Sequence, residues 1–168
     1  MKTLRDVVIF LVDDDKLFLK SLEYHLQHRL KYTIKIRSFP TGEECLNNLH
    51  QNPTIVVLDY LLNANYPDAM NGVQVLQKIK ETNPEIEVIM LSGHEKVEVA
   101  LETMKYGAYD YVLKNETVLL KIQSVIRNAI DSIAVKRQVK TYKLLMQIIG
   151  GIALVILLIV LVKRMFLH

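Results

Sequence analysis

Residues 7–15 read VVIFLVDDD, six apolar residues followed by three aspartates. An apolar run of this length, rich in β-branched residues and ended by polar ones, is typical of a strand buried on both faces of a sheet. Similar short runs recur downstream, at 33–39, 55–58, 87–91 and 109–113. We therefore predict five strands.

Helical patterns separate these runs. Apolar residues recur every three or four positions at 16–30, 41–48, 73–81, 97–106 and from 116 onward. Regular alternation of strands and helices favours a parallel sheet, because each crossover returns the chain to the same end of the sheet. The predicted fold class is α/β, a doubly wound five-stranded parallel sheet of the (βα)5 type. In such sheets, functional polar groups gather at the carboxyl ends of the strands.

Three carboxylates are expected at that edge. Asp13 and Asp14 follow the first strand directly, and Asp59 ends the third. Carboxylates held close together repel one another, so at neutral pH they need a proton or a hard cation, and oxygen ligands of this kind suit Mg²⁺. We predict a magnesium site here. Asp15, by contrast, is predicted to cap the helix that follows, a position at which Asp is favoured.

Two further polar residues are placed at the same edge. Ser92 ends the fourth strand and Lys114 follows the fifth. A carboxylate nucleophile, a hydroxyl donor, an ammonium and a divalent cation together suit phosphoryl transfer, with Asp59 as the nucleophile. Each residue alone is also typical of a solvated turn or a protein surface. Their occurrence in order at successive strand ends is what indicates a site.

Four strand ends carry characteristic segments, which are VDDD (12–15), VVLDY (56–60), MLSG (90–93) and GAYDYVLK (107–114). Together they resemble the receiver domain of two-component response regulators, over about residues 4–130. The resemblance implies a flavodoxin-like fold and phosphorylation of Asp59. It also implies that Asp13, Asp14 and Asp59 hold Mg²⁺ together with the backbone carbonyl of Leu61.

The same resemblance assigns roles to three residues on the later strands. It implies that Lys114 binds the phosphoryl group and that Ser92 and Tyr111 form a switch pair. In such a pair Ser92 moves to the phosphoryl oxygen, and the ring of Tyr111 fills the space it leaves. The implied phosphodonor is a sensor histidine kinase or a phosphotransfer protein. On the residues alone, Tyr111 is equally a plain core aromatic.

The carboxyl-terminal part of the chain contains a long apolar stretch, LLMQIIGGIALVILLIVLV at 144–162. A helix of this length covers roughly 30 Å, the thickness of a bilayer's hydrocarbon core, so we expect a transmembrane helix. A buried core helix or an oligomerisation helix is the alternative. The expected order is a receiver domain at 1–130, a basic helical connector at 131–143, the transmembrane helix, and a short tail at 163–168.

Charge is divided unevenly between the two parts of the chain. Residues 1–130 hold 15 Lys and Arg against 17 Asp and Glu, whereas 131–168 hold six against one. The basic residues of the second part flank the apolar stretch, so we expect lipid contact and no nucleic-acid binding. They are Lys136, Arg137, Lys140, Lys143, Lys163 and Arg164. By the positive-inside bias the receiver domain is expected to face the cytoplasm, and the resemblance implies that the membrane is a bacterial inner membrane.

Two functions stay open on the sequence. The first is a membrane-tethered phosphoacceptor that lacks a catalytic or DNA-binding output domain and acts through a partner, or as a homodimer through the helices at 97–106 and from 116. The second is a receiver-like membrane scaffold that is not phosphorylated. A metal-dependent aspartyl phosphatase is disfavoured, because Leu61 stands where a second acid is required. The stretch 61–70 is longer than receivers usually have before Asn71.

Overall fold

A single parallel sheet forms the centre of the amino-terminal part of the chain. The structure is a computed structural model that describes residues 7–62, 69–93 and 97–166. The strands are β1 (Val7–Val12), β2 (Ile34–Phe39), β3 (Ile55–Asp59), β4 (Glu87–Ser92) and β5 (Asp110–Leu113). Their order in the sheet is β2-β1-β3-β4-β5, and every pairing is parallel. The predicted five-stranded α/β fold is confirmed.

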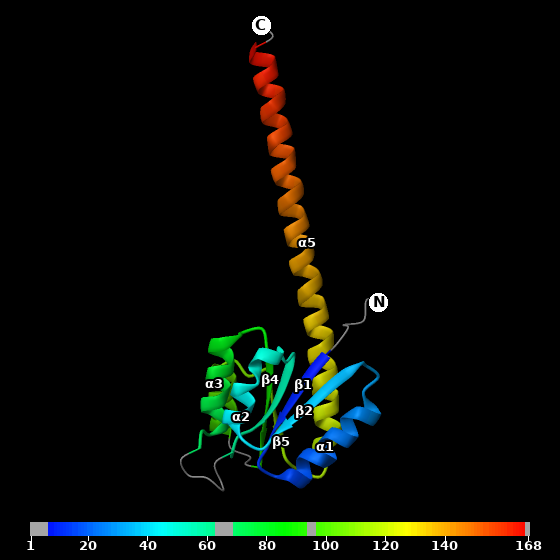
Figure 1. Ribbon diagram of the computed structural model, residues 1–168, viewed down its shortest axis with the longest axis vertical. Helices are drawn as coiled ribbons and strands as arrows, with labels where there is room; N and C mark the ends of the chain where they lie inside the picture. The colour runs from blue at the N-terminus through cyan, green and yellow to red at the C-terminus, as the bar shows by residue number, and fades with distance from the viewer. Residues whose placement is uncertain (1–6, 63–68, 94–96, 167–168) are drawn as a thin grey trace. The chain divides into compact units, whose positions relative to one another are not determined.

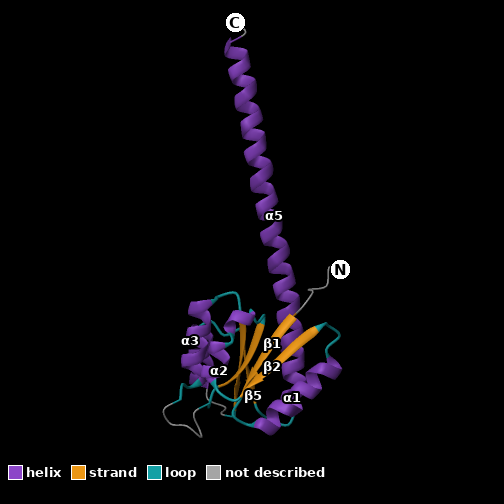
Figure 2. Ribbon diagram, viewed as in Figure 1, coloured by secondary structure: helices purple, strands orange, loops and turns teal. Residues whose placement is uncertain are grey.

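Helices connect successive strands and cover both faces of the sheet (Figure 1, Figure 2). They are α1 (Lys16–Arg29), α2 (Gly42–Asn47), the short 3-10 helix η1 (Leu49–Gln51), α3 (Gly72–Thr82), α4 (Val97–Lys105) and α5 (Val118–Phe166). In Figure 2, α2 and α3 lie on one side of the strands, and α1 and the start of α5 lie on the other. This arrangement is the doubly wound architecture that the alternating pattern predicts.

The core explains why the central strands are apolar throughout. All five residues of β3 and all six of β4 are buried, because helices cover both faces. On the α2 and α3 side, Phe10 packs edge-to-face against Phe39 with ring centroids 4.8 Å apart. On the other side, Leu22 and Leu26 of α1 are fully buried, as is Ile126 of α5. Within β3 and β4, polar residues occur only at the ends of the strands.

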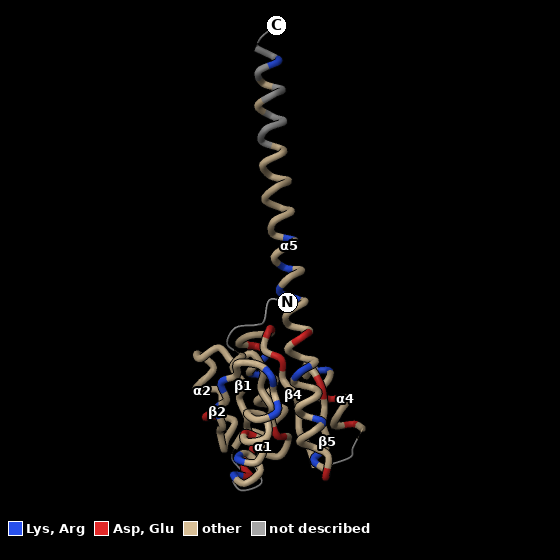
Figure 3. The backbone as a smooth tube through the Cα atoms, turned by 90° about the vertical axis from the view of Figure 1, so that its right-hand side faces the viewer, with Lys and Arg blue, Asp and Glu red and all other residues tan. Residues whose placement is uncertain are grey.

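The chain divides into two compact units, Met1–Ile130 and Asp131–His168. The described part of the second unit is the continuation of α5, and Lys and Arg positions lie in the first half of this segment (Figure 3). Lys136, Arg137, Lys140 and Lys143 are exposed there.

The expected transmembrane helix at 144–162 and the inner-membrane location are corrected by the structure. Within the described residues, no helix is both long and apolar enough to cross a membrane. A span needs about 20 consecutive apolar residues. The membrane-flanking role expected for the six basic residues is not tested by the structure.

Candidate functional site

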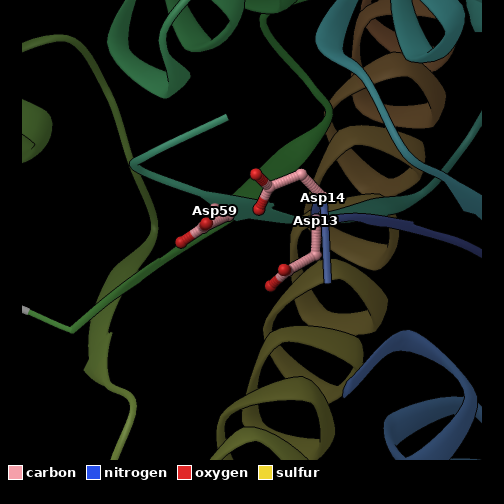
Figure 4. Close-up of side chains that lie close together, drawn as sticks. All are labelled: Asp13, Asp14 and Asp59. Atoms are coloured by element: carbon pink, nitrogen blue, oxygen red, sulfur yellow. The ribbon is translucent and has the colours of Figure 1, made fainter. Parts of the chain in front are cut away.

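Three carboxylates converge where β1 and β3 end. Asp13, Asp14 and Asp59 each offer an oxygen, and these oxygens lie within 4.8 Å of one another. Figure 4 shows the three side chains directed into the same region from two neighbouring strands. Asp13 and Asp59 are almost fully buried, with 1% and 4% of their surfaces exposed. The order of the sheet brings them together, because β1 and β3 are adjacent although they are distant in the sequence.

Lys114 supplies the positive charge of the site. Its Nζ lies 2.7 Å from Oδ2 of Asp13 and 3.0 Å from Oδ1 of Asp59. The backbone N–H of Lys114 donates to the carbonyl oxygen of Ser92 over 2.8 Å, which extends the pairing of β4 and β5 by one residue. The ammonium of Lys114 therefore lies between the buried carboxylates of Asp13 and Asp59, close to the carboxyl ends of the strands.

The turn after β1 orients the first carboxylate. The backbone N–H of Asp15 donates to Oδ1 of Asp13 over 3.0 Å. Asp15 in turn accepts at Oδ1 from the backbone N–H groups of Leu17, at 2.9 Å, and Phe18, at 3.0 Å. These bonds satisfy two of the open donors at the start of α1. The predicted capping role of Asp15 is confirmed.

Burial shifts the proton affinities of the site. Loss of solvent raises the pKa of Asp59 to about 6, although the Lys114 ammonium opposes the shift. Burial likewise raises the pKa of Asp13 against the pull of Lys114. For Lys114, burial lowers the pKa, but the two carboxylates outweigh this effect and the net shift is upward. The positive charge of Lys114 therefore does not fully offset the desolvation of the ionised Asp13 and Asp59 carboxylates. The site favours binding of a proton or of a second cation.

A divalent cation fits this arrangement. The acidic oxygens form a hard ligand set, and Oδ2 of Asp13 is buried with the Lys114 ammonium 2.7 Å away as its charged neighbour. Receiver domains typically bind Mg²⁺ at such an aspartate cluster. The residues that would hold it are Asp13, Asp14 and Asp59.

Magnesium affinity is expected to fall at acid pH. Because the pKa of Asp59 is about 6, a proton competes with Mg²⁺ below that value, and the apparent affinity should be about tenfold weaker at pH 5 than at pH 7.5. Titration calorimetry of the wild-type chain at both pH values measures this. In Asp59→Asn the pH dependence should flatten. Equal affinities at both pH values in the wild type would contradict the prediction.

The free energy of unfolding of the metal-free protein should fall as pH rises, whereas the Mg²⁺ affinity should increase. The folded-state pKa of Asp59, about 6, lies above its ordinary value of 3.8. The folded state therefore binds more protons than the unfolded state between these values, and stability is lost as pH rises through that window. Bound Mg²⁺ should restore stability above pH 6, since it binds the ionised carboxylates.

The remaining predicted site residues lie at or near the same edge. Ser92 is fully buried at the end of β4, in register with Leu113 of β5. Tyr111 of β5 is paired with Met90 of β4 and is half-buried against the core on the α2 and α3 side. Leu61 follows β3 and is 39% exposed. The switch role of Ser92 and Tyr111 and the metal contact of the Leu61 carbonyl stay predictions.

Two residues near the site have no assigned role in the sequence interpretation. The ring of Phe18 lies under the Lys114 ammonium, with Nζ 5.2 Å from the ring centroid. Gly72 packs its backbone against the end of β3, where its N–H donates to the carbonyl oxygen of Tyr60 over 3.0 Å. A Cβ at Gly72 would overlap the carbonyl oxygen of Asp59. An Asn-Gly pair marks this position in the sequence, whereas nothing in the sequence singles out Phe18.

Two loops follow strands β5 and β3 near the site. Asn115 accepts at Oδ1 from the backbone N–H of Thr117 over 3.1 Å, and α5 begins at Val118 rather than at 116. Most of the long stretch 61–70 lies outside the described residues, namely 63–68. Its described end is held by Glu43 of α2, which accepts from the backbone N–H of Met70 over 2.9 Å.

Known proteins match this chain along most of its first unit. The pattern of the family "Response regulator receiver domain" matches residues 9–125. Among curated relatives, the luminescence regulatory protein LuxO of Vibrio campbellii is 29% identical over 100 residues, covering 57% of this chain and 21% of LuxO. The photosynthetic apparatus regulatory protein RegA of Rhodobacter capsulatus is 29% identical over 109 residues, which cover 65% of this chain and 55% of RegA. The chain spans about a fifth of the length of the LuxO relative.

Solved structures show the same fold. The signal receiver domain of a LuxO repressor protein from Vibrio parahaemolyticus superposes with a TM-score of 0.70 at 22% identity, covering 81% of this chain and 98% of that domain. The BeF3-activated DrrB receiver domain is 35% identical, with a TM-score of 0.59. The match covers 72% of this chain and 97% of that domain. The fold, the aspartate cluster at its strand ends and the family match agree, and the chain belongs to the response regulator receiver domain family.

Proposed function

We propose that this protein is a phosphoacceptor of two-component signalling that is phosphorylated on Asp59 by a sensor histidine kinase or a phosphotransfer protein. The observation that carries the proposal is the position of the Asp59 carboxylate, which lies beside Asp13 and Asp14 and 3.0 Å from the Lys114 ammonium. The nucleophile Asp59, the acidic cation site and the Lys114 ammonium thus lie around the position where the phosphoryl group would bind.

The chemistry is a transfer from one nucleophile to another. A carboxylate oxygen of Asp59 attacks the phosphorus of the donor and forms a P–O bond. The bond from phosphorus to the donor's histidine nitrogen breaks, and its electron pair stays on that nitrogen. Lys114 offsets the charge that spreads over the phosphoryl oxygens. Asp13, Asp14, Asp59 and the carbonyl of Leu61 would hold Mg²⁺, which would neutralise part of the phosphoryl charge.

The response to phosphorylation is proposed to pass from Ser92 to Tyr111. Ser92 is buried at the end of β4, and Tyr111 lies two register positions away on the adjacent strand β5. The output is binding of a partner protein or a second copy through α4 and α5, rather than binding of nucleic acid. Support comes from Val97, Leu101 and Met104, which are exposed on one stripe of α4.

Replacement of Asp59 tests the function. The full chain, incubated with acetyl phosphate and Mg²⁺, is expected to gain the mass of one phosphoryl group, and Asp59→Asn is expected to gain none, because the amide is not a nucleophile. Intact mass spectrometry measures both. Asp131→Asn, which alters an exposed carboxylate of α5, is the matched control and should behave as wild type.

Two outcomes would contradict the proposal. Equal labelling of wild type and Asp59→Asn would place the phosphate elsewhere. A folded wild-type chain that binds Mg²⁺ but takes up no phosphate would favour a receiver-like docking module that is not phosphorylated.

A further inference from the structure

The Lys114 ammonium has an uncharged partner besides its two carboxylates. Phe18, in the first turn of α1, places its ring centroid 5.2 Å from Lys114 Nζ. An ammonium within about 6 Å of an aromatic ring face is attracted by the negative potential of that face. Phe18 is half-buried and the Lys114 side chain is 24% exposed, so water screens the contact only in part.

The ring is held in place by the same turn that orients Asp13. The backbone N–H of Phe18 donates to Asp15 Oδ1 over 3.0 Å, and the backbone N–H of Asp15 donates to Asp13 Oδ1 over 3.0 Å. The other oxygen of Asp13 is 2.7 Å from Lys114 Nζ. The contacts therefore link Phe18, Asp15, Asp13 and Lys114 in a ring. Phe18 and Asp13 both contact the Lys114 ammonium, and the hydrogen bonds to Asp15 and Asp13 connect the two within one turn.

We infer that Phe18 is a positioning residue for phosphoryl transfer, whose ring keeps the Lys114 ammonium at the carboxylate cluster while the carboxylates change partners. The inference rests on the proposed phosphorylation of Asp59. During that reaction Asp59 becomes an acyl phosphate, and the aspartates are shared with Mg²⁺. Lys114 must then exchange a carboxylate partner for a phosphoryl oxygen, while Mg²⁺ competes for the oxygens of Asp13. The ring of Phe18 is neutral, so it neither competes with Mg²⁺ nor changes charge during the reaction.

A plain packing role makes a different prediction from a positioning role. If Phe18 only fills space, leucine should replace it with little effect on the reaction, and any loss of rate should follow a loss of stability. If the ring face holds the ammonium, an aromatic substitute should work and an aliphatic one should not. The effect should also vanish when residue 114 carries no charge.

The test compares Phe18→Leu with Phe18→Tyr in the full chain, using acetyl phosphate at saturating Mg²⁺. We expect Phe18→Leu to be phosphorylated about fivefold more slowly than wild type, the factor that a partly exposed ammonium–ring contact supports. Phe18→Tyr should stay within about twofold of wild type. The Mg²⁺ affinity of Phe18→Leu should match that of wild type, and the variant should remain folded at the assay temperature.

Lys114→Met provides the background that isolates the contact. In that background, adding Phe18→Leu should cause no further loss of rate. A second readout needs no phosphorylation: the Cε protons of Lys114 should be shifted upfield in the NMR spectrum by the Phe18 ring, and the shift should disappear in Phe18→Leu.

Three results would overturn the inference. Phe18→Leu could react at the wild-type rate, it could slow the Lys114→Met protein by the same factor, or it could leave the Lys114 proton shifts unchanged. Absence of any phosphate on the wild-type chain would instead refute the proposed function, and with it the reaction that Phe18 is inferred to serve. The proton shifts report the ring contact separately from that failure.

Discussion

Replacing Lys114 by methionine is expected to lower the free energy of unfolding of the metal-free protein by about 3 kcal/mol at pH 8. The ammonium lies within 3.0 Å of both Asp13 and Asp59, which are almost fully buried. Without it, two neighbouring carboxylates lose their cation in a desolvated site. Urea denaturation in the presence of a chelator measures the difference.

The dependence on pH and metal separates this effect from lost packing. At pH 5 the loss should be smaller, because the pKa of Asp59, already about 6 in the wild type, rises further without Lys114 and the carboxyl binds a proton. Mg²⁺ should stabilise Lys114→Met more than wild type, since it replaces the missing charge. Lys114→Arg, which keeps the charge, is the control. An equal loss at both pH values, with no additional benefit from Mg²⁺, would show that the ammonium does not offset the carboxylates.

Replacing Gly72 by alanine is expected to destabilise the domain by about 3 kcal/mol and to slow phosphorylation of Asp59. An added Cβ would overlap the carbonyl oxygen of Asp59 and lie 2.8 Å from the Cα of Tyr60. Both obstacles are backbone atoms, so no side-chain rotation relieves the overlap. Either α3 or the end of β3 must move, and movement of β3 carries the Asp59 carboxylate with it.

Gly93→Ala is the matched control for this substitution. Gly93 is exposed after β4, and a Cβ there would meet no described atom within 4 Å. Its effect on stability should stay within about 0.5 kcal/mol. Chemical denaturation and the initial rate with acetyl phosphate measure both variants. Similar stability losses in the two variants would mean that the close approach of Gly72 to β3 is not what constrains this position.

Strand positions follow closely from the sequence because burial on both faces demands continuous apolar runs. The run at 7–12 is β1, and those at 55–58 and 87–91 are each extended by one polar residue, Asp59 or Ser92. Helix boundaries are less well predicted. α5 begins at Val118, because Asn115 first forms a side-chain turn with Thr117. Such local hydrogen bonds compete with helix formation and leave little trace in apolar spacing.

At the apolar stretch 144–162 the expectation from the sequence and the finding from the structure differ. Length and composition predict a membrane span, whereas in the described part of the chain no helix meets the requirements for one.

The sequence by itself determined the fold class and the cluster of Asp13, Asp14, Asp59 and Lys114, because parallel strands bring their carboxyl ends to one edge. Only the tertiary structure decided which groups surround that cluster. The ring of Phe18 beside Lys114 and the backbone of Gly72 against Asp59 come from segments that touch the site through packing. Residue type and spacing encode periodic burial, whereas these contacts depend on how helices lie against the sheet, which periodicity does not specify.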